Sequence, residues 1–234
     1  MNKKACRVLA DAFPGRWNRE YCYWKLRTDP LYPAATAALL DVDDGEVPLL
    51  DIGCGLGLFA RYLRQAGFRA PIHGIDYDAR KIRAAKAISE RADGEMLEFR
   101  EGDVRETLPN FAGHLSILDV LQYLTGEQQQ DLLQQMAASV APNGCLIIRS
   151  GLAEPTWRFR ITRVADWFAH GCFWMKGRPM NYPEKEGTER FLRDAGLVGT
   201  FTPLWGKTPF NNYLGVFRRA VAGRVGGGQS RAQR

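Results

Sequence analysis

The sequence lacks a long hydrophobic run. None of its apolar stretches approaches the roughly 20 residues that a membrane-spanning helix needs. The N-terminal stretch MNKKACRVLADAFPGRW has two lysines but no extended apolar segment behind them, which argues against a secretory signal peptide. We therefore expect no stable membrane insertion. With 234 residues, 45% of them hydrophobic, the chain has enough apolar side chains for one domain with a sizeable core.

The sequence also has few candidates for metal or redox chemistry. Its five cysteines include no C-x-x-C pair and no cluster with the three histidines, and their odd number does not suit a disulfide framework. Cys54 lies in a glycine-rich turn and Cys145 in an apolar run, so both are interpreted as small buried residues. We expect reduced thiols, no metal ion and a cytoplasmic protein.

Acidic residues are missing from the end of the chain. Six lysines and arginines follow Asp194, so residues 1–194 hold 26 basic and 26 acidic residues. A folded nucleic-acid-binding domain usually carries a basic face, and this balance does not favour one. Three of these six positive charges lie in residues 220–234, a tail with Gly, Ser and Gln that we expect to be disordered. A weak contact of this tail with anionic lipid or RNA is left open.

What the sequence does contain is a predicted strand, glycine turn and helix in residues 47–63, VPLLDIGCGLGLFARYL. The unbroken apolar run at its start predicts a strand buried on both faces. Asp51 ends that run, and Gly53, Gly55 and Gly57 follow at every second position. Glycine permits the sharp turn and lets a ligand approach the backbone closely. The unpaired N–H groups at the start of the next helix face the same crevice.

This turn favours a cationic or amino-acid-bearing ligand. Dinucleotide enzymes place a pyrophosphate on the pattern G-x-G-x-x-G. The turn in this chain is one residue tighter and has an acid two positions ahead of its first glycine. The form D-x-G-x-G-x-G resembles the first motif of class I methyltransferases, which bind S-adenosylmethionine (SAM). A plain strand-to-helix turn and a nicotinamide site are the alternatives for this motif alone.

An acid ends the second predicted strand, residues 71–76. Asp76 lies 25 residues after Asp51. In a βαβ unit, an acid about 20 residues past the glycines reaches the ribose hydroxyls of a bound nucleotide. Asp78 fits better as the N-cap of the following helix.

Acids recur beside the next two predicted strands. Asp103 follows residues 97–101, and Asp119 lies near the end of residues 115–121. Ligands of open α/β sheets lie outside the carboxyl ends of the strands, so these acids should border one site.

Together with the glycine turn, these acids strongly resemble those of class I SAM-dependent methyltransferases over about residues 47–150. The resemblance implies a Rossmann-like α/β fold: a seven-stranded, mostly parallel sheet with helices on both faces and an antiparallel last strand. It implies SAM as the cofactor, with Asp51 near its amino-acid end, Asp76 at the ribose and Asp103 at the adenine. The predicted cofactor-binding residues are Asp51, Gly53, Cys54, Gly55, Gly57, Asp76, Tyr77, Asp103, Val104, Asp119 and Val120.

We expect a single domain over residues 1–219. Residues 1–45 mix aromatic side chains with lysine and arginine, and they are interpreted as a helical cap over the crevice or as helices packed on the sheet edge. Residues 46–150 are the predicted SAM-binding core. Residues 151–219 are predicted to hold an aromatic-rich, substrate-shaping insertion and the closing strands.

A narrower resemblance concerns the acceptor. The segments KLRTDPLY, LLDIGCGLGL, DVLQYL and WGKTPFNNYLGVFRR are similar to those of a bacterial methyltransferase subgroup encoded beside fatty-acid-synthase-like genes for aryl polyene pigments. That resemblance implies a 4-hydroxyphenyl acceptor or a carrier-bound aryl polyene intermediate. The predicted substrate residues are Gln122, Tyr123, Arg149, Trp157 and Asn211. Histidine would be expected in this subgroup where the chain has Gln122, whose amide does not titrate near neutral pH.

The sequence does not identify a catalytic base. A base is needed only if the acceptor carries a proton that must leave, and the candidates are Tyr123, His170 and Tyr182. Two other functions stay open: an RNA methyltransferase, and a non-catalytic SAM-fold partner in a biosynthetic complex. The charge balance disfavours the RNA enzyme, as does the sequence DVLQ at residues 119–122 in place of an N/D-P-P-Y/F/W motif.

Overall fold

The fold is described from a computed structural model of the chain. It describes residues 2–42, 45–89, 96–106, 108–171 and 181–220, without the side chains of residues 165–171. Within these ranges no helix is long and apolar enough to cross a membrane. The predicted tail beyond residue 220 lies outside the described residues.

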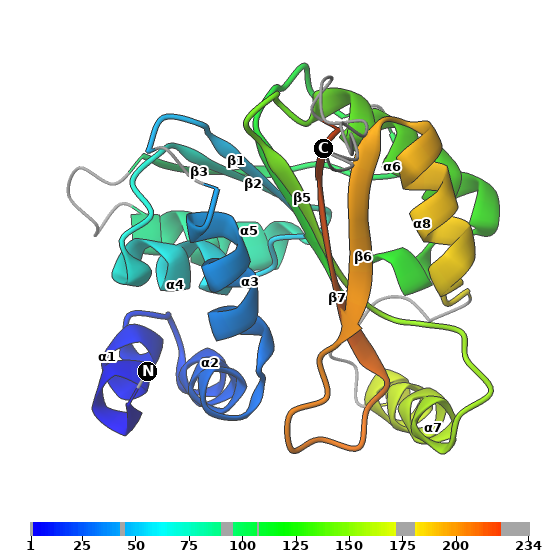
Figure 1. Ribbon diagram of the computed structural model, residues 1–234. Helices are drawn as coiled ribbons and strands as arrows, with labels where there is room; N and C mark the ends of the chain where they lie inside the picture. The colour runs from blue at the N-terminus through cyan, green and yellow to red at the C-terminus, as the bar shows by residue number, and fades with distance from the viewer. Residues whose placement is uncertain (1, 43–44, 90–95, 107, 172–180, 221–234) are drawn as a thin grey trace, which may run out of the picture.

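Seven strands form one mixed sheet in the order β3-β2-β1-β4-β5-β7-β6 (Figure 1). The strands are β1 (Leu49–Ile52), β2 (Ile72–Asp76), β3 (Leu97–Glu101), β4 (His114–Leu118), β5 (Cys145–Gly151), β6 (Leu197–Pro203) and β7 (Asn212–Arg219). Strands β1 to β5 run parallel to one another, and β7 is antiparallel to both β5 and β6. This confirms the predicted Rossmann-like sheet with its antiparallel last strand.

Helices cover both faces of the sheet and one of its ends (Figure 1). They are α1 (Lys3–Asp11), α2 (Arg16–Thr28), α3 (Leu31–Leu40), α4 (Leu58–Ala66), α5 (Ala79–Ser89), α6 (Gly126–Ser139), α7 (Trp157–Gly171) and α8 (Lys185–Asp194), with a short 3₁₀ helix η1 (Leu121–Tyr123). In Figure 1, α3, α4 and α5 lie on one face and α6 and α8 on the other, while α2 and α7 lie below the sheet.

The apolar runs in β1 and β5 lie between two hydrophobic cores. Leu49 and Ile147 pack with the residues of helices α1 to α5, and both are fully buried. Their neighbours Leu50 and Ile148 point to the other face and pack with α6 and α8. Successive side chains of a strand face opposite sides, so a strand covered on both sides has no polar alternation.

A capping box starts α6. The Thr125 side chain accepts a hydrogen bond from the N–H of Gln128, and the Gln128 side chain accepts one from the N–H of Thr125. Two of the unpaired donors at the start of the helix are thereby satisfied.

The N-terminal helices are only partly predicted. Helices at about residues 17–27 and 33–40 are expected, and α2 and α3 confirm them. The sequence analysis does not predict α1. This helix starts with a simple N-cap, in which the Asn2 side chain accepts from the N–H of Ala5 at 2.9 Å.

The predicted fourth strand is too long. The apolar pattern suggests a strand to residue 121, but β4 ends at Leu118. Asp119 has a φ of 62°, in the left-handed region that β-strands do not use, and η1 follows it directly. The chain therefore turns sharply at the point where the sequence places a ligand-binding acid.

Candidate functional site

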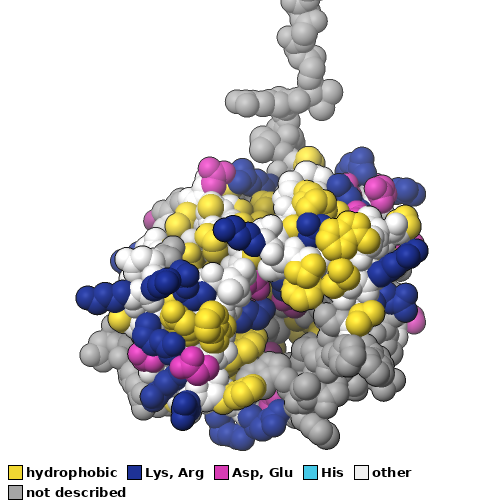
Figure 2. All heavy atoms as spheres, turned by 90° about the horizontal axis from the view of Figure 1, so that it is seen from below, with side chains coloured by type: hydrophobic (Ala, Val, Ile, Leu, Met, Phe, Trp, Pro, Cys, Tyr) yellow, Lys and Arg dark blue, Asp and Glu magenta, His cyan; other side chains and the backbone are white. Residues whose placement is uncertain are grey.

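A cavity of about 710 Å³ lies at the carboxyl ends of the parallel strands. Residues at the ends of β1, β2, β4 and β5 and just beyond β3 line it, together with side chains of α2, α3 and α7. Figure 2 looks onto this end of the molecule and shows acidic side chains recessed near the centre, beside hydrophobic ones. Both its place and its size are those of a small-molecule site in an open α/β sheet.

The glycine turn is tied to the end of β2. The N–H groups of Gly53 and Cys54 donate to the carbonyl of Ile75 at 2.7 and 3.0 Å. Gly53 and Gly55 have φ values of 73° and 57°, which other residues rarely adopt. A Cβ atom on Gly55 would meet nothing within 4 Å, so the backbone at Gly55 borders open cavity space. A ligand can approach the main chain closely there.

Gly57 has another purpose. It is the N-cap of α4 in a left-handed conformation and is not among the residues that line the cavity. A Cβ atom there would lie 2.8 Å from the Phe99 ring. The missing side chain of Gly57 therefore makes room for packing against β3, and the contact of Gly57 with the cofactor stays a prediction.

Asp51 is a buried carboxyl group at the cavity wall. Only 2% of it is exposed, and its Oδ1 accepts a hydrogen bond from the Ser116 hydroxyl at 2.6 Å. Burial raises the pKa of Asp51 to about 7, against the effect of the Ser116 hydrogen bond, and the nearby Asp76 adds to the rise. No lysine or arginine of the described chain pairs with Asp51. A cationic ligand in the cavity would therefore favour its ionised form.

Asp76 holds the turn and the next helix together. Its Oδ2 accepts from the N–H of Gly55 at 2.9 Å, and its Oδ1 accepts from the N–H of Asp78 at 2.8 Å. A carboxylate has about four acceptor positions, so both oxygens can also accept from ligand hydroxyls. Asp78 itself caps α5 through the N–H of Arg80 at 3.0 Å, as expected for an N-cap.

The residues beyond β2 and β3 also line the cavity. Tyr77, Asp103 and Val104 all border it, at the positions predicted for the nucleoside. Arg105 pairs with Asp103, and its hydrogen bond holds the pKa of Asp103 below the usual value in spite of partial burial. Asp103 is therefore an ionised acceptor at neutral pH.

The turn after β4 lies at the middle of the cavity. Asp119, Val120, Gln122 and Tyr123 all line it, as predicted. Val120 packs so closely over the glycine turn that a Cβ atom on Gly53 would lie 2.3 Å from its Cγ2. The absence of a side chain at Gly53 thus lets this turn sit against the glycine turn.

The predicted substrate residues divide into two groups. Arg149 lines the cavity together with Gln122 and Tyr123. Trp157 does not: it is 60% exposed and packs against the guanidinium of Arg158. Asn211 is fully buried outside the lining, where its side-chain amide donates to the carbonyl of Leu152 at 2.9 Å. Trp157 and Asn211 therefore do not line the described cavity, and their role in substrate binding stays a prediction.

Two of the three candidate bases reach the cavity. Tyr123 and Tyr182 line it, and the Tyr182 ring packs edge-on against Phe159 with centroids 5.0 Å apart. The side chain of His170 lies outside the described residues. No histidine occurs among the residues that line the described cavity.

Several lining residues were not predicted individually. The cap, here meaning helices α1 to α3, contributes Tyr21, Lys25, Leu31 and Tyr32. Other unpredicted lining residues include Lys81, Arg105, Thr162, Phe210 and Asn212. Side chains of the cap thus line the cavity, and others pack in the hydrophobic core on one face of the sheet.

The described residues contain no group of three or more His, Cys, Asp or Glu side chains that would hold a metal ion. Four cysteines, Cys6, Cys22, Cys54 and Cys145, are buried free thiols, as the spacing suggests. Cys172 is outside the described residues.

Residues 49–144 match a protein-family model described as a methyltransferase domain. A carboxy-S-adenosyl-L-methionine synthase from Chromohalobacter salexigens is 27% identical over 110 residues, which are 45% of this chain and 40% of that protein. The alignment therefore spans less than half the length of this curated relative.

Solved structures show the same fold. A magnesium protoporphyrin IX methyltransferase from Synechocystis with bound S-adenosylhomocysteine (SAH) superposes with a TM-score of 0.61 at 19% identity, over 81% of this chain and 82% of that one. A 1,6-didemethyltoxoflavin-N1-methyltransferase from Burkholderia thailandensis, also with SAH, gives 0.61 at 16% identity, over 82% and 78%. The architecture of the described chain is thus the Rossmann-like fold of SAM-dependent methyltransferases.

Proposed function

We propose that this chain, which has the fold and the central domain of the SAM-dependent methyltransferases, transfers a methyl group from SAM to a small-molecule acceptor. The finer part of the proposal is that the acceptor carries a hydroxyphenyl group, either free or on a carrier-bound polyene or polyketide-like intermediate.

The observation that carries the proposal is the set of acids around the glycine turn. Asp51, Asp76 and Asp103 reach one cavity from the ends of three neighbouring strands, and Gly55 offers open backbone beside them. Asp51 suits the ammonium group of SAM, because its buried carboxylate has no described cation to pair with. Asp76 and Asp103 suit hydroxyl and amino donors of the nucleoside. These residues fit SAM, the cofactor of this fold.

SAM, when bound, supplies a methyl group already activated on a sulfonium, so the protein's contribution is mainly to hold donor and acceptor in line and to exclude water. Asp51 and the glycine turn bind the donor from the side of β1, while Tyr21 and Tyr32 of the cap close over the cavity. The part of the cavity beside β4 and β5 is then left for the acceptor.

Aromatic side chains support an aryl acceptor. Tyr21, Tyr32, Tyr123, Tyr182 and Phe210 line the cavity from the cap, η1, the segment before α8 and the β6–β7 loop. Such rings pack on an aryl group in edge-on or offset geometry. A phenol must lose its proton on methylation, and Tyr123 and Tyr182 are the described candidates to accept it. Gln122 is near them but cannot titrate.

The test is a transfer assay with labelled SAM. Purified protein is incubated with 4-hydroxycinnamate, 4-hydroxybenzoate and the carrier-protein thioester of 4-hydroxycinnamate, and label in the acceptor is measured. We expect transfer to at least one of them. Asp76→Ala should lower SAM affinity by about tenfold or more, because it removes a carboxylate hydrogen-bonded to the turn and open to the ligand. SAM binding without transfer to any hydroxyphenyl acceptor would contradict the finer part of the proposal.

A further inference from the structure

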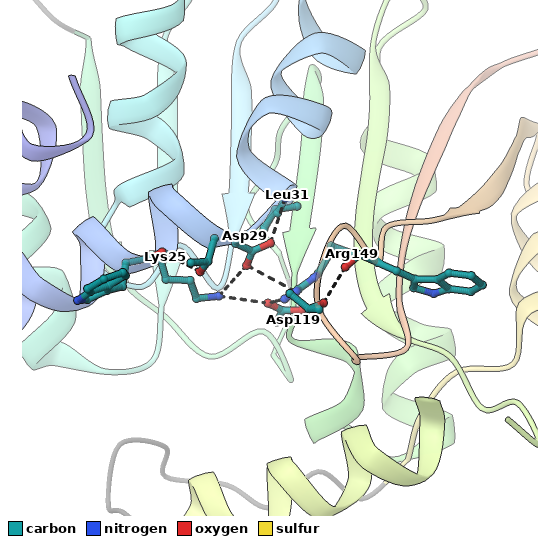
Figure 3. A network of polar contacts seen from close by, with 9 residues as sticks. Lys25, Asp29, Leu31, Asp119 and Arg149 are labelled. Atoms are coloured by element: carbon teal, nitrogen blue, oxygen red, sulfur yellow. Dashed lines mark hydrogen bonds and ion pairs between the residues drawn. The ribbon is translucent and has the colours of Figure 1, made fainter. Parts of the chain in front are cut away.

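Four charged side chains form a closed ring of alternating sign at the cavity wall (Figure 3). The Lys25 Nζ lies 3.1 Å from the Asp29 Oδ2 and 4.0 Å from the Asp119 Oδ2. The Arg149 Nη2 lies 3.6 Å from the Asp29 Oδ2, and its Nη1 pairs closely with the Asp119 Oδ2. Each cation thus contacts both acids. We call Lys25, Asp29, Asp119 and Arg149 the charge ring.

The charge ring connects parts of the chain that are far apart in sequence. Lys25 is on α2 and Asp29 follows that helix, so both belong to the cap. Asp119 follows β4, and Arg149 is on β5. Figure 3 shows these side chains pointing toward one another between the cap and the ends of the strands. The described cavity lies between the same two parts, with lining residues from each.

The ring is well shielded from water on one side. The side chains of Asp29 and Arg149 are only 10% and 9% exposed, and the Arg149 Nε is buried without a hydrogen-bond partner among the described residues. Burial alone would raise the pKa of Asp29, but Arg149 and Lys25 bring it below the usual value. A buried arginine needs its charge partners, because an uncompensated buried charge is costly. Asp29 is therefore one of the two groups that keep Arg149 in place.

Arg149 in turn fixes the backbone after β4. It pairs with the Asp119 carboxylate, and its carbonyl accepts the Asp119 N–H at 2.9 Å. Asp119 has the only described positive φ outside glycine, 62°, a conformation that persists only where the surroundings enforce it. Val120, Gln122 and Tyr123 follow directly and line the cavity. The direction of these side chains therefore depends on the conformation of Asp119.

We propose that Asp29, which does not line the cavity, is a positioning residue for the acceptor. Through Lys25 and Arg149 it holds the cap against the turn after β4 and keeps Gln122 and Tyr123 in their places beside the acceptor. This inference rests on the proposed function for its acceptor, but the ring itself can be tested without one.

The Asp29→Asn variant is the sharpest test. The Asp29 Oδ1 accepts from the N–H of Leu31 at 3.0 Å at the start of α3, and asparagine keeps that acceptor. Its amide nitrogen replaces the Oδ2 that both cations contact. The matched control is Glu20→Gln, which removes an ion pair of 2.8 Å between Glu20 and Arg7 inside the cap and leaves the ring intact.

Three quantities are measured on full-length protein. They are the hydrogen exchange of the backbone amides of residues 119–123, the calorimetric affinity for SAH, and the calorimetric affinity of the SAH-bound protein for 4-hydroxycinnamate. In Asp29→Asn we expect exchange faster by about tenfold or more and 4-hydroxycinnamate affinity lower by a similar factor. SAH affinity should fall by a clearly smaller factor than 4-hydroxycinnamate affinity, because most of the residues assigned to SAH lie at the ends of β1 to β3, away from the charge ring. Glu20→Gln should behave as the wild type in all three.

A rescue variant separates positioning from general loss of stability. In Asp29→Asn, Asp119 is the only acid of the ring, and it lies beside two cations, Lys25 and Arg149. The added change Lys25→Met leaves one acid and one cation, so the ring is again neutral. The double variant should recover part of the protection of residues 119–123. Should Asp29→Asn not fold, Lys25→Met alone should show the same changes to a smaller degree.

Unchanged exchange of residues 119–123 in the ring variants would overturn the proposal. So would an equal effect of Glu20→Gln, because the ring would then be no different from another cap ion pair. If the wild type does not bind 4-hydroxycinnamate, the proposed acceptor fails, while the exchange data still decide on the ring.

Discussion

At the scale of single residues, Asp51 shows how burial prepares a group for its ligand. Its pKa of about 7 in the folded protein is far above that of a free aspartate, mainly because of burial. Without a ligand the neutral form of Asp51 is thus favoured below about pH 7, and a cation that binds beside it shifts the balance toward the ionised form. Proton binding and cofactor binding should therefore be coupled through this one group.

The first prediction concerns Asp51 and stability. A carboxyl group with a raised pKa stabilises the fold fully below its unfolded pKa near 4, and this contribution is lost as the pH rises through about 7. The loss is on the order of 4 kcal/mol, since each pKa unit corresponds to about 1.4 kcal/mol. The free energy of unfolding in urea should therefore differ less between pH 5 and pH 8 in Asp51→Asn than in the wild type. Asp41→Asn, on an exposed ion pair, is the control.

The same group predicts proton release on binding. Below pH 7, SAH should displace about one proton from Asp51, so its affinity should rise with pH up to about 7. Calorimetry at pH 6 in two buffers of different ionisation enthalpy measures this release. An identical binding enthalpy in both buffers would show that Asp51 does not change its protonation.

The glycines offer another prediction at this scale, because two of them differ in what surrounds them. Gly53 and Gly55 both have positive φ, so alanine at either position is strained, by about 1 kcal/mol. A Cβ atom at Gly53 would also collide with Val120, whereas one at Gly55 would enter open cavity space. Gly53→Ala should therefore lose clearly more unfolding free energy in urea.

Gly55→Ala should instead lose SAH affinity, by about tenfold or more, because its methyl group occupies space at the ligand. Calorimetry on both variants separates the two effects. The interpretation of the turn would be wrong if Gly55→Ala bound SAH as tightly as the wild type.

At the scale of elements, hydrophobic pattern and turn chemistry are sufficient to predict a strand or a helix where only local sequence determines it. The apolar runs at β1 and β5 are unbroken because helices cover both faces, and this requires no knowledge of the partners. The end of β4 is different. Val120 and Leu121 continue the apolar pattern, but Asp119 turns the chain, and its conformation depends on Arg149, 30 residues further on. Sequence pattern therefore overextends this strand.

The third prediction belongs to α6. Thr125→Ala removes the side chain that accepts the N–H of Gln128 and should cost about 1 kcal/mol of unfolding free energy. Ser89→Ala is a suitable control, since the exposed Ser89 hydroxyl only donates to the carbonyl of Lys86 within its own helix. Equal midpoints of urea unfolding for the two variants would show that the capping box contributes little.

At the scale of the whole molecule, the acids on β1 and β2 and after β3 were predictable because parallel strands bring their carboxyl ends together by topology. The contributions of the cap were not. Asp29 precedes a proline between two helices, and nothing in its local sequence indicates Arg149, 120 residues away. The sequence could not show that Trp157 and Asn211 lie outside the cavity lining for a related reason, because their orientation depends on how α7 and the β6–β7 loop pack.

The last prediction follows from the cavity being walled by both the cap and the sheet. Tyr21 and Leu31 line it from one side, and Asp51 and Asp76 from the other. A ligand that contacts both parts should couple them, so residues 1–219 should unfold in a single transition that SAH shifts upward. At 100 times the dissociation constant, SAH adds about 2.7 kcal/mol, which corresponds to a rise in Tm of roughly 5–10 °C for a chain of this size.

Calorimetric scans with and without SAH measure the shift, and hydrogen exchange shows where protection appears. Protection should include α2 and α3 as well as the glycine turn, since the cap encloses the ligand. Asp76→Ala should show a smaller shift at the same SAH concentration, because it binds less tightly. Two separate transitions, with SAH moving only the later one, would mean that the cap is an independent unit and that the site is complete without it.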